Sequence, residues 1–467
     1  MRGIASLLLV VAAAGCAGTL PRADRDLFTA IKRGDAGEVE RLLASGANAN
    51  VKPVRDYDGL PPLGWASGWG STKIVELLLA RGANVNGANE HATTPLHVAA
   101  YREDPAVAAV LVHKGAAVSA RNELGFTPLH KAMERLALAP ATRAAPADEV
   151  AKVSSLVELL LASGAQIDAQ TASGAMPIHL AALSGQKSLV QVLLDKGAAV
   201  DARSTEGMTP LYQAARKDAA EVAQLLIARG ADVNARTRSG FTPLTMAAEQ
   251  GSDEVARLLV AGRADVNARD AKRFTPLLAA CRSLLIRYTL EASTPGAADI
   301  RSKFPAGEVA KTRAALGEVR GNFGAVALLL VNSGADPNVP TPAFTPLGAA
   351  ATVGDLALAD ALIAHGAAMN DTSTGESALH AAIAEGHPDV VKLLIARGAN
   401  VNARNMSQLT PLHFVARYTR DRSLAELLIQ HGADVNAKER DGHTPIEVAV
   451  GARNDEIAAV LRQHGAR

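Results

Sequence analysis

A Gly-Ala pair that closes a leucine-rich run recurs along most of this 467-residue chain. The pairs begin at Gly46, Gly82, Gly115, Gly164, Gly197, Gly230, Gly334, Gly366, Gly398, Gly432 and Gly465. Most intervals are 32 to 36 residues, but one interval (115 to 164) is longer, and another (230 to 334) holds a further repeat ending in AGRADVNA (261–268). Counting it gives twelve repeats. This period predicts a row of small supersecondary units that bury their apolar faces against one another.

Each repeat carries start and stop signals for two short helices. Thr242 can cap a helix by accepting a hydrogen bond from an early backbone N–H, and Pro243 takes the first helical position, where its missing N–H is harmless. The run VAQLLIA (222–228) has helical spacing, and Gly230 can adopt the left-handed conformation that ends a helix. The segment ADVNARTRSG (231–240) then supplies the Asn, Ser and Gly of a tight hairpin.

The segments GFTPLHKA and GADVNAR, together with the 33-residue period, resemble the ankyrin repeat. The resemblance covers residues 24–467. It implies an all-α repeat solenoid, a curved stack of about twelve ankyrin repeats with β-hairpin fingers. The sequence departs from the pattern in LPPLGWASGWG (60–70), which lacks the usual Thr and His. Arg273, Ala343 and Gln408 replace the finger glycine and predict less regular fingers.

Two repeats carry insertions, near residues 136–150 and 284–321. The insertions contain the related segments PADEVAK and PAGEVAK. A proline followed by Glu in the first turn starts a helix, so we expect second helices extended at their N-terminal ends. The residues before them (136–145 and 290–304) are predicted to be projecting loops. Functional loops and merely tolerated insertions are both compatible with this pattern.

The N-terminal segment MRGIASLLLVVAAAGC predicts export. Its apolar stretch is too short to span a bilayer and is typical of a signal peptide, assigned to residues 1–15. The end AAGC resembles the lipobox of bacterial lipoproteins, although Ala13 stands where that family more often has Leu. The resemblance implies a lipid on Cys16, a linker at 16–23, and, because Ala17 is not Asp, an outer-membrane location facing the periplasm. Cleavage after AAA, giving a soluble periplasmic or secreted protein, is the alternative.

The charge balance excludes a general attraction to polyanions. Lys and Arg number 48 and Asp and Glu 47, so neither nucleic acid nor anionic lipid is an expected partner, and membrane contact would come through the lipid anchor alone. The second cysteine, Cys281, has no partner for a disulfide if Cys16 is lipidated. It takes a slot that Ala holds in other repeats, which favours a small buried residue.

The histidines do not predict chemistry. His97, His130, His179, His380 and His413 occupy one repeat slot. Neighbouring layers of helices stack about 8 to 10 Å apart, so a metal cannot gather three of these side chains. The family resemblance implies hydrogen bonds within and between repeats. Walker, GxSxG and HExxH motifs are absent from the sequence, so we expect neither an enzyme nor a cofactor.

Two surfaces are candidates for binding a protein. The first is a basic patch on fingers and first helices, formed by Arg203, Arg216, Lys217, Arg236, Arg238, Arg269, Lys272, Arg273 and Arg282. It would suit an acidic segment, unless these charges only keep the stack soluble. The second is aromatic and comprises Trp65, Trp69 and Tyr101 near the N-terminal end. Trp69 is predicted to face outward, whereas Trp65 could equally cover the terminal core.

The sequence thus predicts a non-enzymatic protein–protein interaction module in a bacterial cell envelope. The partner would bind the concave surface of fingers and inner helices. The alternative is a dedicated inhibitor, or a chaperone-like protector, of one cell-envelope enzyme.

Overall fold

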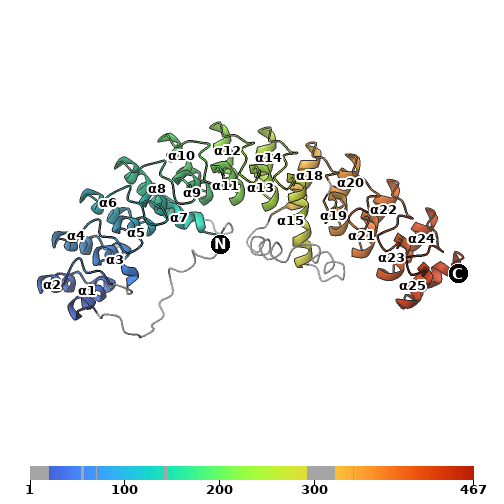
Figure 1. Ribbon diagram of the computed structural model, residues 1–467, viewed down its shortest axis with the longest axis horizontal. Coiled ribbons are helices and arrows are strands. Elements are labelled where there is room, and N and C mark those ends of the chain that lie inside the picture. Colours follow the sequence, from blue (N-terminus) through green and yellow to red (C-terminus); the bar gives the residue numbers. More distant parts are fainter. Residues whose placement is uncertain (1–19, 54–56, 70, 141–144, 292–320, 340) are drawn as a thin grey trace. The chain divides into compact units, whose positions relative to one another are not determined.

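The computed structural model describes residues 20–53, 57–69, 71–140, 145–291, 321–339 and 341–467 (Figure 1). These residues contain 24 α-helices, one short 3-10 helix and no β-strand. They divide into two compact units, each described by itself. The N-terminal unit holds residues up to 138, 145–184 and 191–198, and the C-terminal unit holds the others. The predicted signal peptide (1–15) and Cys16 lie outside the described residues.

The N-terminal unit is built of paired helices. They are α1 (Arg22–Arg33), α2 (Ala36–Ala44), α3 (Pro62–Trp69), α4 (Thr72–Ala80), α5 (Pro95–Tyr101), α6 (Pro105–His113), α7 (Pro128–Leu138), α8 (Ala147–Ala162) and α9 (Pro177–Ser184). First helices pack on first helices, as α3 on α5 and α5 on α7, and second helices on second helices, as α4 on α6. Helix α10 (Lys187–Asp195) contributes residues to both units.

The C-terminal unit repeats the same arrangement. Its helices are α11 (Pro210–Lys217), α12 (Ala220–Ala228), α13 (Pro243–Gln250), α14 (Asp253–Ala261), α15 (Pro276–Glu291), α18 (Phe323–Asn332), α19 (Pro346–Val353), α20 (Leu356–Ala364), α21 (Ala378–Glu385), α22 (Pro388–Ala396), α23 (Pro411–Tyr418), α24 (Arg422–Gln430), α25 (Pro445–Gly451) and α26 (Asp455–Gln463). Helices α11, α13 and α15 pack in one row, and α12, α14 and α18 in the other. The predicted all-α repeat solenoid is confirmed.

The local signals act as predicted. The Thr242 hydroxyl accepts a hydrogen bond from the backbone N–H of Thr245 at 3.2 Å, and Pro243 begins α13. Gly230 has a φ of 86° after α12, where the N–H of Ala231 bonds the carbonyl of Leu226 at 3.0 Å. Buried Ala and Leu side chains, such as Leu244 and Ala247, form the interior between the two rows. Small first-helix residues allow the close approach of successive layers.

Asparagine side chains join one repeat to the next. The Asn338 amide donates to the carbonyl of Gly366 at 2.8 Å, and its oxygen accepts the N–H of Ala368 at 2.9 Å. The same pair of bonds recurs at Asn402, with Gly432 and Asp434. Because the amide satisfies both a donor and an acceptor of the following repeat, this position favours Asn. Asp201 takes the position in another repeat and makes only the accepting bond, from the N–H of Asp232 at 3.0 Å.

The fingers are hydrogen-bonded turns, which corrects the predicted β-hairpins. The N–H of Gly240 bonds the carbonyl of Thr237 at 2.9 Å, and the N–H of Thr237 bonds the carbonyl of Phe241 at 2.9 Å. These two backbone hydrogen bonds close a turn whose flanking segments are too short to form a ladder of paired β-strands. Within the described residues, therefore, the fingers contain no strand.

Two fingers that lack glycine are nevertheless regular. Arg273 and Gln408 have φ values of 64° and 63°, and each bonds the residue three positions earlier at 2.9 Å, as Gly240 does. Packing between fingers thus imposes the left-handed conformation on residues that disfavour it. The prediction of less regular fingers was therefore wrong for Arg273 and Gln408. Ala343 differs from them, because it does not adopt a positive φ.

We expect Gln408→Gly to stabilise the C-terminal unit. Glycine removes the steric cost of the left-handed conformation, which is about 1 kcal/mol. Glycine also raises the conformational entropy of the unfolded chain, and this offsets part of the gain in stability. The adjacent Ser407→Gly change carries only the entropic cost, because Ser407 has no positive φ. Urea denaturation should therefore separate the two variants by about 1 kcal/mol. Equal effects of both would contradict strain at Gln408.

The insertions differ from each other. In the first, α8 has 16 residues against nine in α6, so the predicted N-terminal extension is confirmed. The loop predicted from residue 136 begins later, because α7 continues to Leu138 with Leu136 and Ala137 buried. In the second it is the first helix, α15, that is long, and it continues to Glu291 where a loop was predicted. Buried Leu285, Ile286 and Thr289 carry its packing face beyond the usual length. Residues 141–144 and 292–320, including PAGEVAK, lie outside the described residues.

None of the described helices combines the length and the apolar character that a bilayer-spanning helix requires.

Candidate functional site

The repeated histidines are structural. The Nδ1 atom of His97 lies 2.8 Å from the Thr94 hydroxyl and accepts the Thr94 N–H, while Nε2 lies 3.0 Å from the carbonyl of Phe126 in the next repeat. His130 reaches the carbonyl of Ala175 in the same way at 3.1 Å. Burial lowers the pKa of His97 to about 4, so the neutral ring donates from Nε2. These bonds agree with those that the resemblance implied.

No group of three or more metal-binding side chains gathers anywhere in the described parts of the chain. Cys281 is fully buried, and burial raises the pKa of its thiol to about 12. The thiol is therefore protonated at neutral pH and a poor nucleophile. Its small buried environment agrees with its place in an alanine slot.

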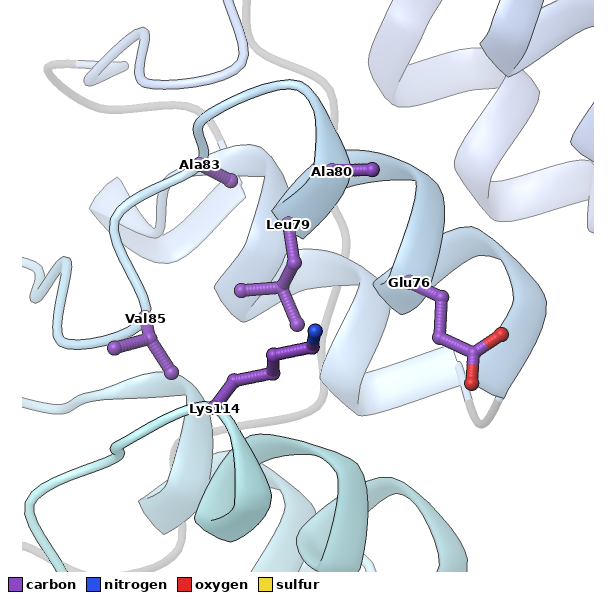
Figure 2. A pocket seen from close by; sticks show the side chains of 6 residues that line it. All are labelled: Glu76, Leu79, Ala80, Ala83, Val85 and Lys114. Atoms are coloured by element: carbon purple, nitrogen blue, oxygen red, sulfur yellow. The ribbon is translucent and has the colours of Figure 1, made fainter.

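A groove of about 460 Å³ lies beside α4 of the N-terminal unit. Figure 2 shows the side chains that line it. The aliphatic part of Lys114 lies beside Leu79, and Glu76 stands at the margin. Ala80, Ala83 and Val85 complete the lining. Open apolar walls with two separated charges do not make the converging polar set that fixes a small ligand.

Six of the nine predicted patch cations form a coherent surface, which we call the basic finger surface. It comprises Arg203, Arg236, Arg238, Arg269, Lys272 and Arg273, all exposed and all on three consecutive fingers. Among the described residues, no carboxylate lies within the 4.0 Å ion-pair distance of any of them. Glu206 is exposed on the same fingers, and Asp270 accepts the N–H groups of Lys272 and Phe274.

The other three cations are engaged within the protein. Arg282 pairs with Glu249 at 2.5 Å and lies 4.9 Å from the ring of Phe274. Lys217 donates to the carbonyl of Ala139, and Arg216 approaches the side chain of Gln213 at 3.5 Å. A cation that already has a partner within the protein contributes less to binding another protein. The candidate surface is therefore limited to the six finger cations.

Sequence reasoning missed a second role of the finger arginines. The Arg203 guanidinium donates to the carbonyl of Arg236 in the next finger at 3.1 Å, and Arg236 donates likewise to the carbonyl of Arg269. Arg404 repeats this contact with Lys438 at 2.8 Å. The available signal was an Ala-Arg pair recurring at one slot of several repeats.

The aromatic candidates lie in the N-terminal unit and are only partly exposed. Trp69 has 45% of its surface exposed, and Lys32 lies 6.0 Å from its ring centroid. Trp65 contacts Phe28 edge-on, with centroids 6.5 Å apart, so it helps to cover the terminal core. Tyr101 lies beneath Lys131 at 5.5 Å.

The sequence matches family descriptions over most of its length. Residues 27–122, 147–237 and 313–405 match the family described as "Ankyrin repeats (3 copies)", and residues 226–277 and 396–449 match the family described as "Ankyrin repeats (many copies)". Ankyrin repeats generally serve as non-enzymatic modules for protein–protein interaction.

Several curated proteins are similar over short stretches. Alpha-latrocrustotoxin-Lt1a of Latrodectus tredecimguttatus is 36% identical over 96 residues, 20% of this chain and 7% of the toxin. Human inversin is 35% identical over 109 residues, 23% of this chain and 10% of inversin. Ankyrin repeat and SOCS box protein 16 of Mus musculus is 40% identical over 73 residues, 16% of each chain. The matches thus cover at most about a sixth of these relatives, and with the family match they lead to one conclusion: the chain belongs to the ankyrin repeat family.

Proposed function

We propose that this chain is a non-enzymatic interaction module that holds an acidic segment of a partner protein on its basic finger surface. The observation that carries the proposal is the set of six exposed finger cations without a carboxylate partner among the described residues. Exposed cations that are not neutralised attract and orient an oppositely charged partner. Fingers of a repeat stack offer them as a continuous edge.

We also propose that the protein is exported and anchored through a lipid on Cys16, facing the periplasm from the outer membrane. The support is the signal-like segment of residues 1–15 and the AAGC sequence before residue 17. Several acyl chains give firm attachment, because each buried methylene contributes about 0.8 kcal/mol. Mass spectrometry of the mature N-terminus tests this: an unmodified N-terminus at Gly15 would contradict lipidation.

Charge reversal tests the basic finger surface. The double variant Arg236→Glu and Arg273→Glu is expected to weaken retention on an immobilised poly-glutamate peptide at least tenfold, and to flatten its salt dependence. The matched control is Arg404→Glu, which has the same slot and the same carbonyl contact in a different finger. Retention unchanged in the double variant, or lost equally in the control, would dismiss the surface.

The alternative of a dedicated inhibitor or chaperone-like protector makes a different prediction for pull-down with residues 20–467. A single stoichiometric partner enzyme would favour it over a general interaction module.

A further inference from the structure

We infer that the basic finger surface recognises an extended acidic peptide that carries one carboxylate at every third residue. The inference rests on the proposed function and gives its partner a specific pattern. It comes from the positions of three arginines relative to one another, not from the total charge.

The three arginines form a regular row. Arg203, Arg236 and Arg269 occupy the same slot of three successive repeats, 33 residues apart, and each is exposed. Successive fingers are joined directly through their backbones: the N–H of Arg238 bonds the carbonyl of Glu206 at 2.8 Å, and the N–H of Ala271 bonds that of Ser239 at 2.9 Å. The row is therefore built on a continuous and hydrogen-bonded base.

Two of the three guanidinium groups are held in place along this row. Arg203 donates one N–H to the carbonyl of Arg236, and Arg236 donates one to the carbonyl of Arg269. A guanidinium has five N–H donors, so the remaining donors stay available for a carboxylate. Because the side chain is already fixed, binding a carboxylate costs less conformational entropy than it would with a free arginine.

The spacing of the row selects the form of the peptide. Stacked helical layers are about 8 to 10 Å apart, so equivalent finger positions recur at about that distance. A polyproline II peptide rises about 3.1 Å per residue with three residues per turn, and thus presents every third side chain on one side, about 9.3 Å apart. A β-strand instead repeats a face every second residue, at about 6.6 Å, and falls out of register with the row.

The second set of finger cations strengthens the same register. Arg238, Lys272 and Arg273 lie two to four residues beyond the row positions on their own fingers. None has a carboxylate partner among the residues that the structure describes. They extend the positive field beside the row and attract any acidic chain. The fixed guanidinium groups then distinguish between spacings.

The experiment compares peptides of equal length and charge. Three proline-rich peptides carry the same number of glutamates, placed at every second, third or fourth residue, and a fourth, helical peptide carries them at every seventh. Binding of residues 20–467 to each is measured at low ionic strength. We expect the every-third peptide to bind at least tenfold more tightly than the others.

Variants assign the preference to the row. Replacing Arg203, Arg236 and Arg269 together by Ala is expected to remove the preference, leaving weak and equal binding through the other cations. Arg404→Ala, which has the same slot outside the row, should preserve it. Circular dichroism of each variant confirms that the helices are intact.

The outcomes separate the two proposals. Equal binding of all four peptides, still abolished by Arg236→Glu with Arg273→Glu, would overturn the spacing rule and leave the proposed function standing. Tighter binding of the helical peptide would overturn the extended form. Failure of every peptide would count against the acidic partner itself, and a polyphosphate that displaces the every-third peptide at lower concentration would overturn a peptide ligand.

Discussion

Lowering the pH from 7 to 5 is expected to reduce the free energy of unfolding by about 2 kcal/mol for each of His97, His130 and His380. Burial lowers the pKa of each ring to about 4, whereas the unfolded chain has the ordinary value of 6.5. Below pH 6.5 the unfolded state therefore binds more protons than the folded state, so stability falls as the pH falls. The loss levels off below about pH 4, where both states are protonated.

The N-terminal unit contains two of these histidines, His97 and His130, and its loss at pH 5 is expected to reach about 4 kcal/mol. His91 acts in the opposite direction, since its hydrogen bond to Glu123 raises its pKa. It lies on an exposed finger, where solvent screens the interaction.

Urea denaturation at pH 7, 6 and 5 measures the change in the free energy of unfolding. A repeat without histidine in this slot provides the design of the control. Thr245 occupies the histidine slot of α13, where its hydroxyl lies 3.0 Å from that of Thr242. The double variant His97→Thr and His130→Thr keeps the cap without a titrating ring. We expect it to be less stable at pH 7 and to lose about 4 kcal/mol of the wild-type pH dependence, while the contribution of His380 remains. A wild-type slope retained in this variant would assign the pH dependence to other groups.

Gly251→Ala is expected to destabilise the C-terminal unit by about 3 kcal/mol. Gly251 ends α13 with a φ of 70°, which costs a residue with a side chain about 1 kcal/mol. A methyl group there would also lie 2.8 Å from the backbone of Gly321 and from the ring of Phe323. Relieving such overlap typically costs a further 1–3 kcal/mol, and it would strain the bond from the Asn322 N–H to the Gly251 carbonyl.

Gly386→Ala provides the matched control. Gly386 ends α21 with a φ of 79°, but a methyl group there meets no atom within 4 Å. This variant is expected to lose only about 1 kcal/mol. Urea midpoints and thermal melts of the two variants compare them directly. Losses of the same size would show that the contact with Gly321 and Phe323 yields at little cost.

The helices of each repeat could be predicted from local sequence signals, whereas the contacts between repeats could not. Thr242 and Pro243 act within a few residues, so the sequence predicts where α13 begins. The sequence places Arg282 in a binding patch, but in the structure Arg282 pairs with Glu249, 33 residues earlier. This ion pair could not be predicted, because it depends on how α13 and α15 align. The length of α15 was missed for the same reason, since Leu285 and Ile286 are buried only by tertiary packing.

The candidate site follows the same division. The charge of the fingers is visible in the sequence, but the carbonyl contacts of Arg203 and Arg236 exist only when fingers stack. The left-handed backbone at Arg273 shows how such stacking overrides local preference.

Helix α15 makes the C-terminal unit resist peeling from its end. When each repeat contacts only its nearest neighbours, the repeats can unfold one at a time from the end of the stack. The Tyr288 hydroxyl of α15 donates to Glu385 of α21 at 2.8 Å, a contact that skips the repeat formed by α19 and α20. An unravelling front that arrives from the C-terminus must therefore release three layers together. Under a steady pull, the largest single rupture force is expected at this block.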